Sequence, residues 1–233
     1  MPEDVSAVQD FFSHWSAYEA AVRANHLYHR EMTAAFNVSL RDRGYVGSML
    51  DLGCGDAGPV PAIVDGCPWS SYSGVDVTGE ALDLARGRAA DWSVPSTFIL
   101  GDFNEVLPGL AGAYDTILVS LAMHHLPNED KPAFFAAALG HLGRGGVLLA
   151  YEPACRPGED RLDYAARQSV DFRRTFTELT EEQTESINQH VIDSDYPVSP
   201  GEYASLAIDA GFMQARLLFR DPHDYWAAMA FTR

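Results

Sequence analysis

From Met49 onward, the sequence alternates between short apolar runs and segments with helical periodicity. Apolar runs of about four to eight residues separated by helices predict βαβ units, and successive βαβ units build a parallel sheet. Helices are expected over Gly79–Ala90 and Asn128–Leu142, the second with Asn128 as its N-cap. Strands are expected near residues 48–52, 72–77, 97–101, 114–120 and 146–152. The alternation therefore predicts an α/β fold.

The segments on either side of the alternation follow other patterns. Residues 1–44 carry apolar and aromatic positions at helical spacing and are expected to form an N-terminal helical lid. Residues 45–152 hold the alternating core, and residues 153–198 are acidic and helix-rich, which predicts a helical cap inserted after the fifth strand. Because a single core can grow to roughly 250 residues, the 233 residues are expected to form one domain.

Residues 199–233 predict a terminal helix and a hairpin. Ser199 and Glu202 have the spacing of a capping box, and Gly211 is placed to end the helix that they begin. Two apolar stretches follow, joined by Asp221-Pro222-His223-Asp224, a connection too short for a crossover helix. An antiparallel hairpin is therefore expected to complete the mostly parallel sheet.

Charge and composition disfavour several classes of function. The formal net charge of −17 disfavours nucleic-acid and anionic membrane partners, because binding to phosphates depends on basic residues. The acidic start lacks a basic and apolar leader, and no apolar run is long enough to span a bilayer. The three cysteines, Cys54, Cys67 and Cys155, have no paired spacing. We expect a cytoplasmic protein without disulfides or a structural zinc site.

A glycine-rich loop, Gly53-Cys54-Gly55-Asp56-Ala57-Gly58, follows the first strand. The three glycines by themselves also match the dinucleotide-binding fingerprint, so they leave the ligand open. Asp51 and Asp56 favour one choice, because carboxylates at this loop repel a pyrophosphate and attract an ammonium group. The loop therefore favours a ligand with a cationic nitrogen.

Further polar residues follow the next three strands. Asp76 ends the second strand, where a carboxylate can accept hydrogen bonds from both hydroxyls of a ribose. Asp102 and Phe103 follow the third strand, and together they suit an adenine amino group and ring. The fourth strand runs into Ser120-Leu121 and then His124-His125.

As a set, these elements closely resemble the class I S-adenosylmethionine-dependent methyltransferases, over about residues 48–152 and the C-terminal hairpin. The resemblance implies a Rossmann-like seven-stranded sheet and S-adenosylmethionine as the cofactor. It implies that the glycine loop holds the methionine moiety, the second-strand acid the ribose and the third-strand acid the adenine. The implied cofactor-binding residues are Tyr28, Asp51, Gly53, Cys54, Gly55, Asp76, Val77, Asp102, Phe103, Ser120 and Leu121.

His124, His125 and Glu152 are the candidate catalytic residues, because they lie where the fourth and fifth strands are expected to open towards a substrate. Neighbouring side chains at a strand end tend to point to opposite sides, so only one histidine is expected to serve the site, and His124 is favoured. In the alternative interpretation, the histidines only pack or bind backbone, and Glu152 caps a helix.

The function that follows from the resemblance is direct SN2 transfer of a methyl group to an N, O, S or C nucleophile of a small molecule. Positioning supplies much of the acceleration, a general base is optional, and no metal is expected. Two alternatives are a member of the family with a non-methylating activity and a non-catalytic scaffold protein. An oxidoreductase that uses NAD is a more distant one.

Overall fold

The computed structural model describes residues 21–175 and 180–233, so the part of the predicted N-terminal helical lid within residues 1–20 lies outside the described part. The helices are α3 (His29–Arg43), α4 (Val60–Val64), α5 (Gly79–Ala89), α6 (Phe103–Val106), α7 (Lys131–His141), α8 (Arg161–Thr175), α9 (Glu181–Ser194) and α10 (Pro200–Ala210), with 3-10 turns η1 (Leu107–Gly109) and η2 (Met123–His125). The strands are β1 (Gly47–Leu52), β2 (Trp69–Asp76), β3 (Ser96–Leu100), β4 (Tyr114–Ser120), β5 (Leu142–Pro153), β6 (Gln214–Arg220) and β7 (Trp226–Thr232).

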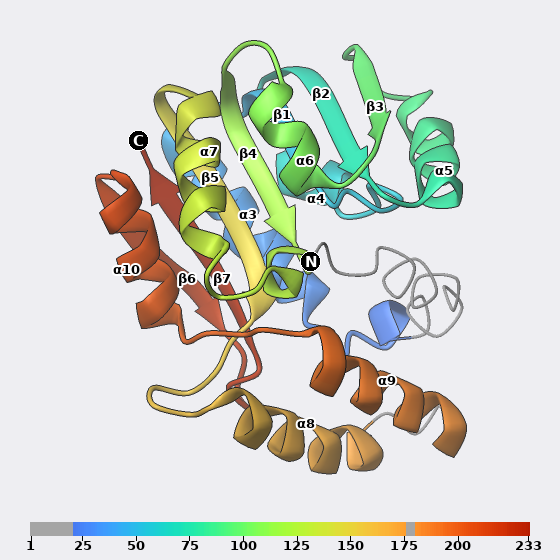
Figure 1. Cartoon of the computed structure of the whole chain (residues 1–233). Helices are drawn as coiled ribbons and strands as arrows, with labels where there is room; N and C mark the ends of the chain where they lie inside the picture. Colours follow the sequence, from blue (N-terminus) through green and yellow to red (C-terminus); the bar gives the residue numbers. More distant parts are fainter. Residues whose placement is uncertain (1–20, 176–179) are drawn as a thin grey trace.

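The strands form one sheet in the order β3-β2-β1-β4-β5-β7-β6 (Figure 1). The first five are parallel, and β7 runs antiparallel to both β5 and β6, which confirms the predicted Rossmann-like sheet with its hairpin. Although β7 follows β6 in the chain, it lies inside the sheet. The strand order reverses between β1 and β4, and open α/β sheets bind ligands at the carboxyl ends of strands beside such a reversal.

The sheet separates two apolar cores, because successive side chains of a strand point to opposite faces. Met49 and Leu118 pack on the face covered by α3 and α4, whereas Leu50 and Ile117 pack on the face covered by α7 and α10. All four side chains are at most 2% exposed. Burying each contributes about 1.5–3 kcal/mol, so the sheet is a firm base for the loops at its ends.

Helix α7 begins three residues later than predicted. The helix expected from Asn128 begins at Lys131 instead, because residues 127–130 form a turn in which the Asp130 N–H donates to the Pro127 carbonyl. The Asn128 side chain accepts a hydrogen bond from Lys131 Nζ at 3.0 Å and does not act as the predicted cap.

The capping box of α10 is confirmed. Ser199 Oγ accepts from the Glu202 N–H, and Glu202 Oε2 accepts from the Ser199 N–H. Gly211 ends the helix in the left-handed conformation, at φ 106°. A complete capping box fixes where the chain leaves the cap and returns to the sheet.

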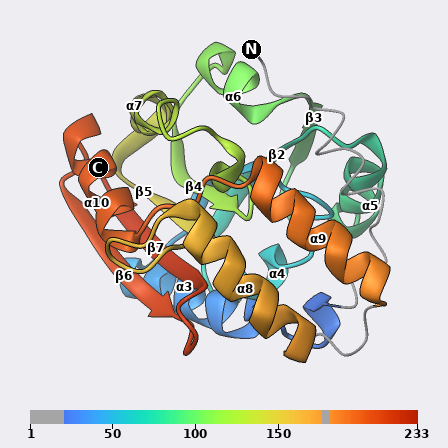
Figure 2. The same ribbon diagram turned by 60° about the horizontal axis from the view of Figure 1, so that its bottom comes forward.

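Helices α8 and α9 lie across the carboxyl ends of the strands (Figures 1 and 2). Arg167 of α8 donates to both carboxylate oxygens of Glu159, at 2.7 and 2.8 Å. The chain after α9 is joined to the end of β4, because the Tyr196 N–H donates to the His124 carbonyl at 2.7 Å. The predicted cap therefore contains the helices α8 and α9 among its described residues, and the contact of Tyr196 joins it to the turn after β4.

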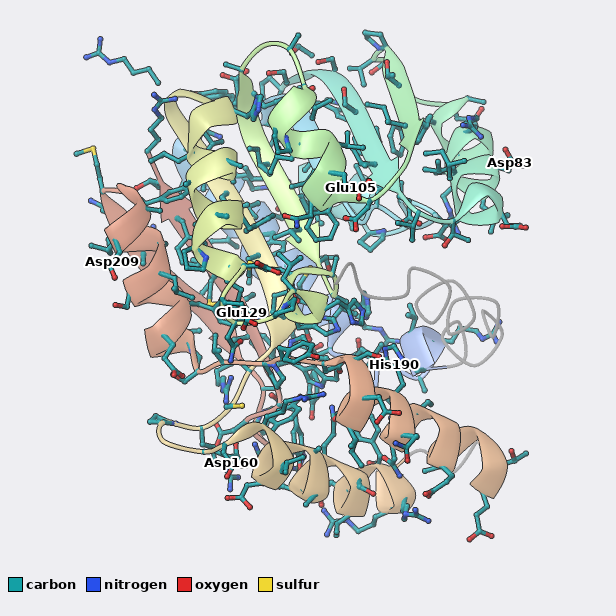
Figure 3. All side chains as sticks on the ribbon, in the orientation of Figure 1. Asp83, Glu105, Glu129, Asp160, His190 and Asp209 are labelled. Atoms are coloured by element: carbon teal, nitrogen blue, oxygen red, sulfur yellow. The ribbon has the colours of Figure 1, made fainter. Side chains whose placement is uncertain are left out.

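No helix within residues 21–175 and 180–233 is both long and apolar enough to cross a bilayer. The negative charge is spread around the molecule, since acidic side chains such as Asp83, Asp160 and Asp209 lie at separate edges (Figure 3). All three cysteines are free thiols, and all are buried.

Candidate functional site

A cavity lies at the carboxyl ends of β1, β2 and β4, and side chains of the cap helices α8 and α9 line its other side. Its polar lining includes His29, Asp51, Asp56, Asp76, Thr78, Ser120, His124, His125, Gln168, His190 and Asp195. Its apolar lining includes Leu27, Met32, Ile63, Leu118, Leu121, Phe172, Ile187, Val191 and Trp226. Residues far apart in the sequence thus form one site at the reversal of strand order.

The glycine loop forms the floor of the cavity beside β1. Gly53 and Gly55 have left-handed backbones, at φ 70° and 52°, which favour glycine. A Cβ on Gly53 would come within 2.6 Å of the Ala122 Cβ, so the loop packs directly against the turn after β4. The Gly53 and Cys54 N–H groups donate to the Val75 carbonyl, which holds the loop against β2.

Asp51 is a buried carboxyl group at the end of β1. Its Oδ2 accepts a hydrogen bond from Tyr72 Oη at 2.7 Å, and the residue is only 3% exposed. Burial raises the pKa of Asp51 to about 7, the Tyr72 hydrogen bond opposes this rise, and the neighbouring Asp76 adds to it. An ammonium group beside Asp51 would favour its ionised form.

The carboxylate of Asp76 links β2 to the glycine loop. Oδ2 accepts from the Gly55 N–H and Oδ1 from the Thr78 N–H, both at 2.8 Å. A carboxylate offers about four acceptor positions, so each oxygen can still accept from one hydroxyl of a ligand. Burial raises the pKa of Asp76, and its backbone hydrogen bonds oppose the rise.

Asp56 lines the cavity, but its carboxylate is already engaged. Oδ2 lies 2.6 Å from Arg88 Nη2, and Oδ1 accepts from the Gly58 N–H at 2.9 Å. The pairing with Arg88 leaves less of the Asp56 charge for a ligand. Asp51 and Asp76, by contrast, have no arginine partner among the described residues.

Asp102 and Phe103 lie away from the described lining of the cavity. Asp102 Oδ1 accepts from the Asn104 N–H and caps α6, and Phe103 packs edge to face against Phe134. Val77, which separates Asp76 from Thr78, is also outside that lining. Pro59, Val60 and Ile63 of the α4 region contribute to the wall instead.

The end of β4 reaches the cavity through Ser120 and Leu121. Leu121 has a left-handed backbone, at φ 53°, which is strained for a residue other than glycine. Its N–H donates to the Tyr151 carbonyl at 2.7 Å, and this bond holds the unusual conformation. Such strain is concentrated at functional sites.

Glu152 is fully buried beneath the η2 turn. Oε1 accepts from the Met123 N–H at 3.0 Å, and Oε2 accepts from the His124 N–H at 3.2 Å. Oε2 also lies 2.7 Å from His124 Nδ1, so the carboxylate fixes both the turn and the ring. The structure thus places Glu152 behind His124 and out of the described cavity lining.

His124 and His125 both line the cavity, with ring centroids 4.0 Å apart. The prediction that their rings point to opposite sides is wrong, because the η2 turn replaces the alternation of an extended strand. Both rings face Asp195. Burial alone would lower the pKa of His125, but the Asp195 carboxylate raises it above its ordinary value.

Asp195 and His190 complete this cluster, and neither residue was predicted from the sequence. Asp195 Oδ1 lies 3.6 Å from His124 Nε2, 3.4 Å from His125 Nδ1 and 3.5 Å from His190 Nε2. His190 lies on the side of α9 that faces the sheet (Figure 3). Burial lowers the pKa of His190 to about 4. Burial alone would raise the pKa of Asp195, but the surrounding histidines lower it below its ordinary value. The acidic cap sequence offered no motif for this convergence.

The N-terminal region contributes through His29. His29 lines the cavity and is 7% exposed, and burial lowers its pKa to about 4. Tyr28 is the left-handed N-cap of α3, and its ring lies 6.1 Å from the Phe219 ring, outside the described lining. Tyr151 Oη donates to the Leu27 carbonyl at 2.6 Å and thereby joins this region to β5.

The strand order and the cavity at the carboxyl ends of the strands define a Rossmann-like α/β fold, and comparison with known proteins shows which families this chain is similar to. Residues 49–146 match the family model described as a methyltransferase domain. The magnesium protoporphyrin IX methyltransferase of Synechocystis PCC 6803, solved with bound SAH, superposes with a TM-score of 0.63 at 16% identity and covers 98% of each chain. Over residues 49–146 the chain is therefore similar to the methyltransferase-domain family, and its overall fold is that of a solved methyltransferase.

Two curated relatives match part of the chain. O-methyltransferase atr3 of Stereocaulon alpinum is 36% identical over 96 residues, which cover 39% of this chain and 27% of the relative. The 2-heptyl-1-hydroxyquinolin-4(1H)-one methyltransferase of Mycobacteroides abscessus is 27% identical over 124 residues, covering 52% and 53%. This chain therefore spans about a quarter and about half of the lengths of these relatives.

Proposed function

We propose that this protein transfers the methyl group of S-adenosylmethionine to a small organic molecule held beneath the cap. The observation that carries the proposal is the joining, in one cavity, of the glycine loop, the carboxyls of Asp51 and Asp76, and the histidines after β4. When bound, the cofactor supplies a sulfonium-activated methyl group. The chain then has to bind, orient and exclude water, which are effects of positioning.

The loop side of the cavity fits the cofactor. Asp76 keeps acceptor capacity on both oxygens for ribose hydroxyls, and Asp51 offers a buried carboxyl to an ammonium group. Gly53 and Gly55 have left-handed backbones that favour glycine, and a side chain at Gly53 would collide with the turn after β4. Asp102, Phe103, Val77 and Tyr28 have less support for a contact in the described conformation.

The cap side of the cavity fits an acceptor with an apolar body. Phe172 of α8 and Ile187 and Val191 of α9 face the cavity, together with Trp226 of β7. Such walls suit a small organic molecule better than a nucleic acid, which the net charge of −17 also repels. The polar end of the acceptor is then directed to His124, His125 and Asp195.

Calorimetry with S-adenosylhomocysteine tests the cofactor site. Asp76→Ala should weaken binding by roughly 1.5–3 kcal/mol, the scale of hydrogen bonds to a charged group. Asp83→Ala is the matched control, since Asp83 lies on α5 with a 79% exposed side chain that pairs with Arg86. Equal affinity in folded Asp76→Ala and wild-type protein would contradict the ribose assignment.

A second experiment tests the transfer itself. Wild-type protein would be incubated with cofactor labelled in its methyl group and with fractionated cell extract. Label in a low-molecular-weight product, which is lost in Asp76→Ala, is the expected result. Label only in macromolecules would contradict the choice of a small acceptor, and S-adenosylhomocysteine binding without any transfer would favour a non-methylating member of the family.

A further inference from the structure

The histidines of the cavity surround Asp195 at distances longer than those of ordinary hydrogen bonds. Three imidazole nitrogens, from His124, His125 and His190, surround a single oxygen of Asp195 at 3.4 to 3.6 Å. N–H···O hydrogen bonds have donor–acceptor distances up to about 3.2 Å. Asp195 Oδ1 is buried and makes no hydrogen bond by this geometry, in a residue that is only 5% exposed.

The same distances suit a coordination polyhedron. With metal–ligand bonds of about 2.0–2.2 Å, the corners of a tetrahedron are roughly 3.3–3.6 Å apart. One nitrogen each from His124 and His125 and one oxygen of Asp195 all lie within 4.8 Å of one another, so small side-chain rotations would bring the three ligand atoms around one ion. The separations from Asp195 Oδ1 already have the length of such an edge.

The tautomer of His124 also supports a metal ion. His124 Nδ1 lies 2.7 Å from Glu152 Oε2, so this nitrogen donates its proton to the carboxylate. In the neutral ring, Nε2 then carries a lone pair on the side of Asp195 Oδ1, and either a proton on Nε2 or a metal ion between the two atoms removes their repulsion. A carboxylate behind the far nitrogen is also the usual partner of a metal-binding histidine.

Charge balance supports a divalent ion. Glu152 and Asp195 are acidic residues with 0% and 5% exposure, and among the described residues no lysine or arginine pairs with either. Buried charges are usually paired or bound to metals. We propose that His124, His125 and Asp195 bind a divalent first-row transition metal such as Zn²⁺ or Fe²⁺, with His190 beside them. Nitrogen-rich ligands favour these ions over Mg²⁺ or Ca²⁺.

The position of the cluster suggests an acceptor class, and this step rests on the proposed function. Three protein ligands leave a coordination position that can face the cavity, where a hydroxyl of the acceptor binds. Such a hydroxyl loses its proton to water near neutral pH, because the ion lowers its pKa. An oxygen lone pair then forms the new C–O bond while the C–S bond breaks, and its electron pair stays on sulfur. The products are a methyl ether and S-adenosylhomocysteine.

Metal binding is tested on the full chain after treatment with a chelator. Titration with Co²⁺, followed by its visible d–d absorption and by calorimetry, should show one tight site in wild-type protein. Asp195→Asn should weaken that site by more than about 100-fold, beyond the 10–100-fold range of groups that only orient a ligand. Asp193→Asn is the matched control, because Asp193 is an exposed carboxylate of α9 that contacts Gln189. The control should bind as wild type does.

Each outcome has a fixed meaning. Absence of a stoichiometric Co²⁺ site in wild-type protein overturns the proposal and needs no variant. Equal losses in Asp195→Asn and Asp193→Asn also overturn it, and circular dichroism shows whether both variants fold. Calorimetry with S-adenosylhomocysteine on the same samples separates the two proposals. If the protein binds S-adenosylhomocysteine but not Co²⁺, the proposed function stands and the metal site is refuted. If it binds Co²⁺ but not S-adenosylhomocysteine, the metal site stands and the proposed function is refuted.

Discussion

The pH dependence of cofactor-product binding is predicted to be set by Asp51. Burial raises its pKa to about 7, even though Tyr72 Oη donates to the carboxylate at 2.7 Å. An ammonium group of the ligand binds the ionised form better, so a proton must leave Asp51 on binding at lower pH. We expect the affinity for S-adenosylhomocysteine to rise from pH 5.5 to about 7 and then to level off.

The size of the effect follows from linkage. Each pH unit below the pKa costs roughly 1.4 kcal/mol to remove the proton, so affinity should change by up to about tenfold per unit below pH 7. The unfolded chain loses this proton near the ordinary pKa of about 3.9, whereas the folded ligand-free protein keeps it to about 7. The folded state holds the extra proton between these values, so the contribution of Asp51 to stability falls as the pH rises from 4 to 7.

Two variants isolate the effect of Asp51. Asp51→Asn keeps the shape and the acceptor for Tyr72 but does not titrate, so its weaker binding should lack this part of the pH dependence. Its melting temperature should exceed that of wild type at pH 7.5 and approach it at pH 4. Tyr72→Phe removes a hydrogen bond that favours the carboxylate, so the midpoint should move to higher pH. Parallel binding curves for wild type and Asp51→Asn would refute the reasoning.

Three further results are expected. His124→Ala should lower kcat by about 10²–10⁴-fold in single-turnover assays, while the affinity for S-adenosylhomocysteine stays nearly constant. His141→Ala is the control and should be active, because the His141 ring contacts the Gly112 carbonyl. Full activity in both variants would contradict a catalytic role for His124. Hydrogen exchange in the cap, residues 156–198, should slow when S-adenosylhomocysteine and acceptor bind, and indifference to both would argue against a role in specificity. Ser199→Ala should lower the free energy of unfolding by about 1 kcal/mol in denaturant titrations, because it removes the cap of α10. Ser205→Ala, at an exposed position of the same helix, should be nearly neutral. Equal effects of the two variants would show that the capping box does not stabilise the protein.

The sheet could be predicted because its information is local. Each buried strand is an apolar run, and positions such as Met49 and Leu50 pack on opposite faces as period-two alternation requires. The hairpin and the capping box at Ser199 also follow from short spacings. The start of α7 was misplaced because Asn128 has a second use, as an acceptor for the Lys131 side chain.

The polar contacts of the cavity could not be read from the sequence in the same way. Asp56 pairs with Arg88, and Asp195 approaches His124 from the far end of α9, so both contacts depend on how separate elements pack. Glu152 was singled out for its place at a strand end, yet the structure shows it holding the η2 turn through backbone N–H groups. Residues at strand ends can be found from the sequence, but their partners come from tertiary packing.

The interior position of β7 has a consequence for how the chain folds during synthesis. β5 pairs with β4 on one side, but its other edge is satisfied only by β7, which leaves the ribosome after the cap, α10 and β6. Until then, an apolar strand edge stays open, and such edges promote pairing between chains. The pairing of β5 with β7 also closes a long loop, which slows folding in general. The yield of folded protein should therefore depend more on residues 226–232 than their distance from the glycine loop suggests.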